Sequence, residues 1–553
     1  MPTSKLAKHG WKILFVSLGA FYLYGLGSLP LVGPDEPRYA QVAREMLQRG
    51  DFITPTLGGV PWFEKPPLLY WMMMASYRVF GVSEFAARLG PAICGLLTAA
   101  FVFWAGKNIT TLNDDDEDVA RGRANLGHWT AFVLLTSLGT IVFSRGASFD
   151  IVLTMAVTGA LCCFIVWHVR NPLSEEGNTR PWLLGGFYLF IGLSLLAKGL
   201  VGIVLPFGII GVYFLARREV PSKRFVVSLL WGMPLAVAIA GVWYGPMVYR
   251  HGWTFIDQFI VQHHFARFFS NKYRHPQPFY FYVPIVAALV LAWTMVLIAT
   301  LTASPRWRWR GMHTIDRTRV FALAWLAVPT LFFSLSGSKI PGYVLPVLPA
   351  ASLLIGERIR FVLKAELGQR LIQLTGGLLL LVAVVGAWSA TRTLNVPSAW
   401  VIAATVPVLV SASVALFAPR RRVLNFLLFG VISVVVSAMA LQPARAIANR
   451  ESVRELMRMA EARGHGAAPV FYFLCDDRTA EFYAGGRLAY QPNGEPIRFD
   501  GAQELPPAIR AKGHVALVLV ETRWEKQLTD YSGVEAEKVG SNGWISLFVV
   551  RPW

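Results

Sequence analysis

Acidic and basic side chains gather where the first apolar stretch of the sequence ends. Asp35, Glu36, Arg38 and Tyr39 follow directly on the apolar residues 11–32. Ionised groups at the end of a membrane-spanning helix are costly unless they serve a function. We therefore predict that this stretch is the catalytic centre of a membrane enzyme, in which the carboxylates orient or deprotonate a substrate.

Further charged or aromatic side chains stand near the ends of later apolar stretches, and they are Glu64, Lys65, Arg145, Asp150, Lys198, Lys339 and Tyr343. Lys65 lies at an outer membrane edge, where the positive-inside rule gives no reason for a lysine. The physical alternative is that this lysine binds an anionic ligand. Arg145 and Asp150 either serve a site, as intramembrane charges often do, or pair with each other and cap helix ends. Lys198 by itself would be an ordinary snorkelling residue.

The composition is that of a membrane protein. Of the 553 residues, 54% are hydrophobic and only 15% are charged, which is too apolar for a chain with a solvated surface. The net charge of +19 could suggest nucleic acid, but basic residues of membrane proteins usually gather in cytoplasmic loops. We therefore expect membrane lipids as partners and no nucleic acid. The cysteines show no metal-binding spacing.

Apolar runs long enough to cross a membrane recur throughout residues 1–441. The sequence predicts about 13 transmembrane helices, at about 11–31, 86–106, 127–143, 150–168, 182–197, 199–216, 225–249, 279–301, 319–336, 342–361, 371–390, 398–417 and 423–441. The fold class is therefore a polytopic α-helical membrane protein.

Alternation of sides places the candidate residues on one face. With the lysine-bearing N-terminus inside, the basic clusters 217–224, 306–310 and 420–422 also fall in the cytoplasm, as the positive-inside rule requires. The outer stretches are then 32–85, 144–149, 250–278, 335–342 and everything after about 442. In the first of them, 36–48 has the periodicity of an amphipathic helix lying along the membrane surface, and Pro66-Pro67 opens a second helix.

The outer loop 250–278 interleaves basic and aromatic residues, among them Arg267. Such a loop at a membrane edge can bind a phosphate beside a lipid chain. His263 and His264 together with Glu64 could also hold a divalent metal ion. Adjacent histidines point in different directions and no third ligand is specified, so we commit to no metal site.

Residues 442–553 differ in composition and predict a separate α/β domain on the outer face. Residues 451–463 have helical periodicity, and 470–474, 515–520 and 544–550 are typical of buried strands. No nucleotide-binding glycine loop is present in this segment. We expect the domain to cover an outer cavity or to bind substrate there.

An outward-facing transferase needs a lipid-linked donor, because soluble nucleotide donors are cytoplasmic. A sugar carried on a lipid phosphate satisfies this requirement. The cations would hold the leaving phosphate, and a carboxylate would orient or deprotonate the acceptor for in-line attack at the anomeric carbon.

Five short stretches together resemble the C-type (GT-C) glycosyltransferases of the protein O-mannosyltransferase superfamily, most of all the bacterial aminoarabinose transferases that modify lipid A. They are Gly33–Ala40, Phe63–Trp71, Ser144–Asp150, Leu195–Gly199 and Ser336–Tyr343. Each stretch alone is weak evidence for the resemblance, but all five occur in the order of the family and on one face of the membrane. The resemblance covers about 1–440 and extends loosely to the C-terminal domain.

The resemblance implies transfer of 4-amino-4-deoxy-L-arabinose from undecaprenyl phosphate to a lipid A phosphate, with inversion, at the periplasmic face of a bacterial inner membrane. It implies Asp35 as the main catalytic residue, with Asp150 and Glu36 as further acidic candidates. The implied substrate-binding residues are Lys65, Arg38, Tyr39, Glu64, Arg145, Lys198, Arg267, Lys339 and Tyr343. We expect a monomer that requires no cofactor, with a divalent ion at Glu64 and the histidines as the open alternative.

Two other functions stay open at this point. One is an O-mannosyltransferase-like enzyme that uses a polyprenyl-phosphate sugar and a protein hydroxyl as acceptor. The other is a lipid transporter, for which internal repeats and charges at mid-membrane are expected. The charges of this sequence collect at one membrane edge instead, and no repeat is visible.

Overall fold

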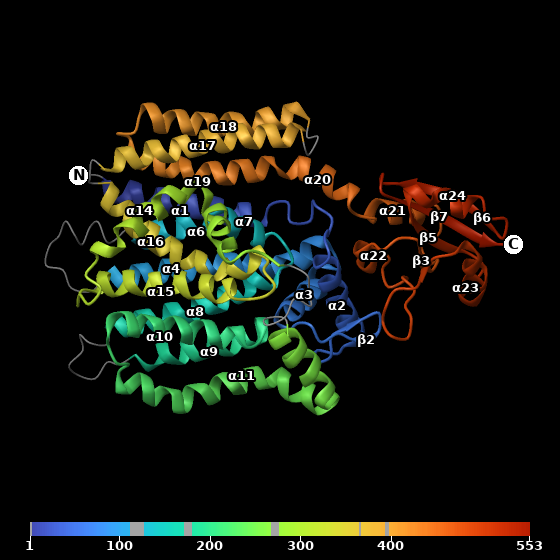
Figure 1. Ribbon diagram of the computed structural model, residues 1–553, viewed down its shortest axis with the longest axis horizontal. Helices are drawn as coiled ribbons and strands as arrows, with labels where there is room; N and C mark the ends of the chain where they lie inside the picture. Colours follow the sequence, from blue (N-terminus) through green and yellow to red (C-terminus); the bar gives the residue numbers. More distant parts are fainter. Residues whose placement is uncertain (1–2, 111–125, 171–179, 267–275, 364–366, 393–396) are drawn as a thin grey trace. The chain divides into compact units, whose positions relative to one another are not determined.

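The computed structural model describes residues 3–110, 126–170, 180–266, 276–363, 367–392 and 397–553, and it divides into two compact units (Figure 1). The first, called here the membrane unit, contains the residues up to Tyr24 together with Glu64–Leu69 and Pro91–Ala440. The second, called the outer unit, contains Gly25–Phe63, Tyr70–Gly90 and Leu441–Trp553. The chain therefore leaves the outer unit at Glu64 and returns to it after Leu69.

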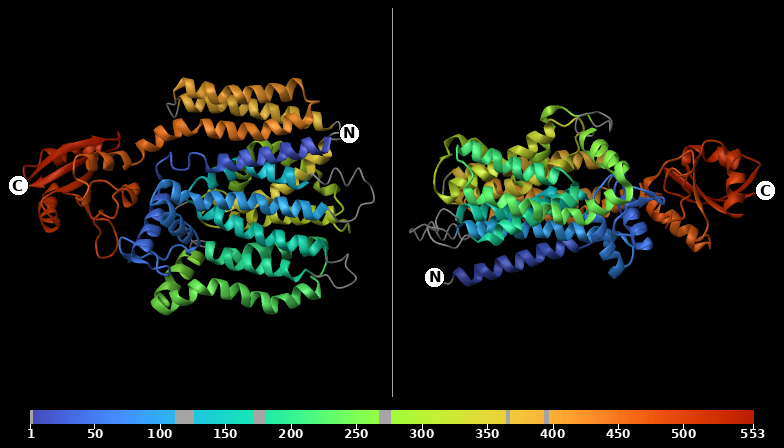
Figure 2. Two further views of the ribbon diagram at one scale, coloured as in Figure 1. Left: turned by 180° about the vertical axis from the view of Figure 1, so that it is seen from behind. Right: turned by 90° about the horizontal axis from the view of Figure 1, so that it is seen from below.

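The membrane unit is a bundle of long helices, most of which run side by side in both views of Figure 2. They are α1 (Thr3–Leu23), α4 (Glu84–Thr110, which begins in the outer unit), α6 (Leu126–Leu135), α7 (Leu138–Ser144), α8 (Phe149–Arg170), α9 (Pro181–Lys198), α10 (Val201–Arg217), α11 (Lys223–Phe255), α13 (Tyr282–Val290), α14 (Thr294–Ala303), α15 (Thr314–Ser334), α16 (Leu348–Val362), α17 (Leu367–Arg392), α18 (Ser398–Phe417) and α19 (Arg422–Met439).

The described residues include nine helices that are long and apolar enough to cross a membrane, or ten if α6 and α7, which meet at a 60° bend, count as one span. Each predicted span overlaps a helix, although the span 11–31 extends beyond α1, which ends at Leu23, and the number 13 is not confirmed. The helices α1, α10 and α15 are not among the nine. The helix α10 has only 17 residues, and lysines or arginines in the first half of α1 and α15 interrupt their apolar character. The chain is a polytopic α-helical membrane protein.

The helix α8 forms the centre of the membrane unit. All but its first-turn Asp150 and its last residue are buried, because nearly every side chain is apolar and neighbouring helices surround it. It packs along α9, and this packing positions the polar ends of both helices.

The helix α11 continues beyond the predicted span. It kinks at Gly252, whose φ of 55° favours glycine. A π-helical segment, η2 (Ile256–Ala266), follows within the stretch that the sequence predicts as a loop.

In the outer unit, α2 (Glu36–Arg49) confirms the predicted helix at 36–48. Its buried residues include Tyr39, Val42 and Met46, as the periodicity predicts. The polar residues Gln41 and Arg44 are buried as well, so the amphipathic pattern predicts only part of the buried surface. It ends at Gly50, which adopts the left-handed conformation at φ 65°. After the short hairpin β1 (Thr56–Leu57) and β2 (Val60–Pro61) comes α3 (Leu68–Phe80), which confirms the helix predicted after Pro66-Pro67.

The C-terminal residues of the outer unit form the predicted α/β fold. The sheet has the order β4-β3-β5-β7-β6, with β3 (Val470–Phe473) parallel to both β4 (Arg498–Phe499) and β5 (Ala516–Glu521), while β6 (Val534–Ser541) and β7 (Ile545–Pro552) are antiparallel. Alternate residues of β3, β5 and β7 enter two separate cores. Helices α21 (Arg454–Ala462) and α22 (Arg478–Tyr483) cover one face, and α23 (Leu505–Lys512) and α24 (Glu525–Thr529) cover the other.

The first outer loop groups with the C-terminal residues, although the sequence places it in the domain 1–441. The Leu31 N–H donates to the Tyr483 hydroxyl at 2.7 Å, and that hydroxyl donates to Glu84 at 3.1 Å. Glu84 also pairs with Arg454 at 3.2 Å. Burial raises the pKa of Tyr483, so the hydroxyl stays protonated and can act as a donor. These contacts join the first outer loop to residues that are far away in the sequence. The predicted domain bounds, 1–441 and 442–553, stay predictions.

Candidate active site

A partly buried acid and base face each other at the ends of two packed helices of the membrane unit. Asp150 lies in the first turn of α8 and Lys198 is the last residue of α9, and the two form an ion pair in which each side chain is 14% exposed. The Lys198 Nζ also lies 4.5 Å from the ring centroid of Tyr343. Three of the five sequence stretches thus meet at one point.

Arg145 binds the end of α1. Its guanidinium donates to the carbonyls of Phe21 at 2.8 Å and Tyr24 at 2.6 Å, and it stacks over the Phe21 ring. The sequence suggested Arg145 as a pairing partner of Asp150, and the structure shows an ion pair of Asp150 with Lys198 that the sequence reasoning did not predict. The contacts of Arg145 fasten α1 to the turn before α8, and its part in substrate binding stays a prediction.

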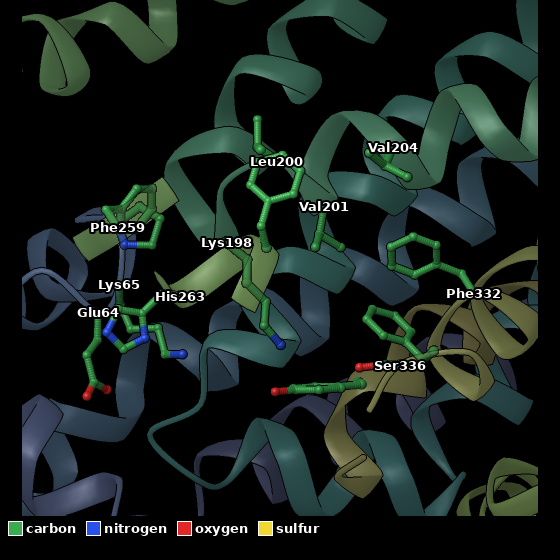
Figure 3. Close-up of a pocket in the computed structure, with 14 residues that line it drawn as sticks. Glu64, Lys65, Lys198, Leu200, Val201, Val204, Phe259, His263, Phe332 and Ser336 are labelled. Atoms are coloured by element: carbon green, nitrogen blue, oxygen red, sulfur yellow. The ribbon is translucent and has the colours of Figure 1, made fainter. Parts of the chain in front are cut away.

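A pocket of about 280 Å³ opens beside this ion pair, within the membrane unit. Its lining residues come from four separate segments, and they are Glu64, Lys65, Pro66, Lys198, Leu200, Val201, Val204, Phe259, His263, Phe265, Phe332, Phe333, Ser336 and Tyr343. In Figure 3, Lys65 and Glu64 lie beside His263 on one side, and Val201, Val204 and Phe332 lie on the other, with Lys198 between them. The pocket therefore has a charged end and an apolar end.

The metal alternative finds no complete ligand set in the described part of the chain. Glu64 and His263 both line the pocket, but no group of three or more His, Cys, Asp or Glu side chains suited to a metal ion occurs among the described residues. The side chain of His264 and all of Arg267 lie outside the described residues.

Lys339 is 8% exposed and holds the turn that precedes Tyr343. Its ammonium donates to the Ser336 carbonyl at 2.7 Å and to the Gln277 carbonyl at 3.0 Å. These contacts give Lys339 a structural task, and the binding of substrate by this lysine stays a prediction.

Gly342 makes room for the carboxylate of Asp150. A Cβ at this position would overlap that carboxylate and come within 2.8 Å of the Phe143 ring. Gly342→Ala should therefore push Asp150 away from Lys198 and lower the glycosyl transfer that the sequence predicts by about tenfold or more, which raises the barrier by about 1.4 kcal/mol. The matched control is Gly241→Ala, because a Cβ there meets nothing within 4 Å. Equal transfer rates of the two variants in purified enzyme would contradict this role of Gly342.

The first predicted catalytic residue is accessible in the outer unit. Asp35 stands just before α2, and its side chain is 53% exposed. Arg38 donates to the Asp35 carboxylate at 2.9 Å and to the Pro34 carbonyl at 2.6 Å, and it lies over the Trp62 ring. Arg38 thus fixes the direction of the Asp35 carboxylate, which can still meet a substrate.

Glu36 faces a buried partner that the sequence reasoning missed. Arg88, which is 3% exposed, pairs with it in a bidentate geometry at 2.7 and 3.1 Å. The same guanidinium donates to the carbonyls of Leu26, Leu29 and Pro30 at 2.7 to 3.0 Å. Glu36 is thus held in a structural contact, and its catalytic role stays a prediction. A lone arginine within the predicted span 86–106 was the signal for such a partner.

Tyr39 contributes to the packing of the outer unit. It is 5% exposed, and its ring packs edge-on against Tyr70 at 6.3 Å. Direct contact of Tyr39 with substrate stays a prediction.

The sequence is similar to a known family of glycosyltransferases and to named bacterial arabinosyl transferases. Residues 13–256 match the family model of dolichyl-phosphate-mannose-protein mannosyltransferases. The chain is 30% identical over 357 residues to the undecaprenyl phosphate-alpha-4-amino-4-deoxy-L-arabinose arabinosyl transferase of Yersinia enterocolitica, covering 63% of this chain and 58% of that protein. It is 31% identical over 364 residues to the protein of the same name from Serratia proteamaculans, covering 64% and 59%. The aligned region is thus less than two thirds of either relative.

The fold is shared with a solved structure. The crystal structure of ArnT from Cupriavidus metallidurans bound to undecaprenyl phosphate superposes with a TM-score of 0.78 at 22% sequence identity, covering 98% of both chains. The membrane helices and the C-terminal sheet thus belong to one known architecture. The resemblance of the chain to the C-type glycosyltransferases of the protein O-mannosyltransferase superfamily is supported by the family match and by the named relatives, and the likeness to the solved structure shows the shared fold.

Proposed function

We propose that the protein is a glycosyltransferase that moves 4-amino-4-deoxy-L-arabinose from undecaprenyl phosphate to a phosphate of lipid A. The observation that carries this proposal is the two-ended pocket of the membrane unit. Lys65 supplies a cation at one end and Lys198 a second one between the two ends, and Leu200, Val201 and Val204 supply an apolar wall. A phosphate joined to a hydrocarbon chain has the same two-part chemistry. The names of the similar proteins specify the same carrier and sugar.

In the proposed reaction, an oxygen of the lipid A phosphate attacks the anomeric carbon of the sugar. The bond between that carbon and the carrier phosphate breaks, and undecaprenyl phosphate leaves with the electron pair. The configuration inverts because attack and departure occur on opposite faces. The acceptor phosphate is already ionised at neutral pH, so no proton needs to be removed. Lys65 and Lys198 stabilise the charge that develops on the leaving phosphate.

Asp35 orients the acceptor or the sugar amine in this proposal. Its carboxylate is accessible and its direction is fixed by Arg38. Asp150 has an indirect role in this proposal, because it positions the Lys198 ammonium against the Tyr343 ring. We place the reaction on the periplasmic side of a bacterial inner membrane, with a monomer as the working unit.

The alternative acceptor is a protein hydroxyl, which the match to protein mannosyltransferases favours. Mass spectrometry of lipid A from cells with and without the gene decides between the two. The proposal expects lipid A to gain the mass of one or more aminopentose residues only when the gene is present. Unmodified lipid A together with sugar-bearing membrane proteins would establish the alternative.

Lys65→Ala should weaken binding of the carrier by about 10- to 100-fold, because one charge-assisted contact to phosphate contributes about 1.5–3 kcal/mol. The measurement is the Kd of undecaprenyl phosphate for the purified variant. Lys223→Ala is the matched control, since this exposed lysine begins α11 and does not line the pocket. Unchanged affinity of Lys65→Ala would remove this lysine from the phosphate site.

Transfer should proceed without a resident cofactor. We expect the activity of purified enzyme to be the same before and after dialysis against EDTA. Loss of activity on dialysis, restored by a divalent ion and abolished in Glu64→Gln and His263→Gln, would instead establish the metal site at these pocket residues.

A further inference from the structure

The outer unit has a second pocket, of about 680 Å³, in its C-terminal α/β fold. Its lining residues lie at or just after the carboxyl ends of β3 and β5 and at the turn that leads into β7, and they are Cys475, Asp476, Glu521, Thr522, Arg523, Gly543, Trp544 and Ile545. None of these residues has a part in the proposed transfer. The pocket therefore needs its own explanation.

Its position in the sheet is typical of a ligand site. The strands β3 and β5 are parallel neighbours, and β4 lies on the other side of β3. From β3 the chain runs to β4 at one side and then to β5 at the other, so the direction of the connections reverses at this point. Ligands of open α/β sheets bind in the crevice outside the carboxyl ends of the strands at such a switch point.

Trp544 forms the aromatic side of the pocket, with a fixed backbone and a ring that is open to solvent. The Trp544 side chain is 73% exposed, although its backbone is held in place. The Asn542 side chain accepts the Trp544 N–H at 3.0 Å and the Ile545 N–H at 2.8 Å, and the Trp544 carbonyl accepts the Thr522 N–H at 2.8 Å. An indole exposed on a fixed turn offers a flat apolar face to a ligand.

The polar side of the pocket offers acceptors and donors together. The Asp476 side chain is 53% exposed, and Glu521 is 35% exposed and paired with Arg523, which is 71% exposed. Arg523 also stacks over Trp524 at 5.3 Å. The carboxylates accept hydrogen bonds, while the guanidinium and the Thr522 hydroxyl donate them. Because the pocket presents both carboxylates and a guanidinium, neither a simple anion nor a simple cation fits it well.

We propose that this crevice binds a saccharide ring. The hydroxyls of a sugar both donate and accept, which matches the mixed polar side, and the C–H face of a pyranose packs on an exposed indole. A nucleotide is a poorer fit, because no glycine-rich loop follows β3 or β5. This site goes beyond the transfer reaction, and it would allow the protein to bind the sugar head group of a glycolipid.

The test is saturation-transfer NMR on the full-length protein in lauryldimethylamine oxide, a detergent without a sugar head group. The probes are methyl N-acetylglucosaminide and its β-linked disaccharide. We expect saturation transfer to both, and about three- to tenfold weaker binding by Trp544→Ala, as expected for loss of one aromatic contact. Asp476→Asn should weaken binding as well. The matched control is Trp553→Ala, because this side chain is also 73% exposed but lies outside the pocket.

Two results would overturn the proposal. One is the absence of saturation transfer to the wild-type protein, and the other is equal affinity of Trp544→Ala and Trp553→Ala. Lys65→Ala separates this site from the membrane pocket, since it should lose sugar transfer and keep saccharide binding. Loss of saccharide binding in Lys65→Ala alone would assign the sugar to the membrane pocket instead. A failure of the proposed transfer reaction would leave the binding result unchanged.

Discussion

Asp35→Asn should lower sugar transfer by about 10²- to 10⁴-fold, the range expected for loss of a positioned acid–base or orienting carboxylate. Asparagine keeps the shape of the side chain and removes its charge, so it can no longer hold the sugar amine by an ionic contact. Since the Asp35 side chain is 53% exposed, the substitution should leave folding intact. The loss should appear in kcat for purified enzyme supplied with both lipid substrates.

The control for this variant is Asp500→Asn, an aspartate with a 78% exposed side chain that also pairs with an arginine. Its activity should equal that of the wild type. Binding of undecaprenyl phosphate should be unchanged in Asp35→Asn, because the phosphate contacts are assigned to other residues. Wild-type turnover by Asp35→Asn would remove this carboxylate from the reaction.

Arg88→Met should destabilise the protein by about 3–5 kcal/mol, the usual cost of breaking a buried ion pair on one side. The variant leaves the Glu36 carboxylate without its bidentate partner. It also removes the donor to the carbonyls of Leu26, Leu29 and Pro30. The melting temperature in detergent, followed by size-exclusion chromatography after heating, should fall clearly below that of the wild type. Sugar transfer should fall with it, because Glu36 adjoins Asp35.

A double variant distinguishes the ion pair from simple loss of packing. Glu36→Gln with Arg88→Met removes both charges, so it should be less destabilised than the sum of the two single variants. Additive losses would show that Arg88 acts through its carbonyl contacts alone. Arg458→Met is the matched control, because this arginine is 59% exposed and pairs with Glu455 at the surface.

Much of this fold could be predicted from local pattern. Apolar runs of membrane length predict helices, because the hydrocarbon core satisfies no backbone hydrogen bonds. The periodicity of 36–48 identified the buried face of α2, and the continuous apolar runs at 470–474 and 515–520 predicted strands with two covered faces. The charged residues at helix ends also pointed to the membrane pocket, since Lys65, Lys198 and Tyr343 all line it.

The specific partners of the charged residues could not be predicted in this way. The sequence suggested only Arg145 as a partner for Asp150, whereas the packing of α8 along α9 brings Lys198 to it. Arg88 and Glu36 are likewise brought together by tertiary structure. Long-range pairing depends on helix orientation, about which the period of a sequence carries no information.

The path of the chain at Glu64–Leu69 has a mechanical consequence. This segment belongs to the membrane unit, yet the residues on both sides of it belong to the outer unit. Lys65 is therefore carried on a strap with both ends fastened to the same neighbour. Because both ends of the segment continue into the same unit, its conformational freedom is lower than that of a segment with a free end. Holding Lys65 at the pocket therefore costs less conformational entropy.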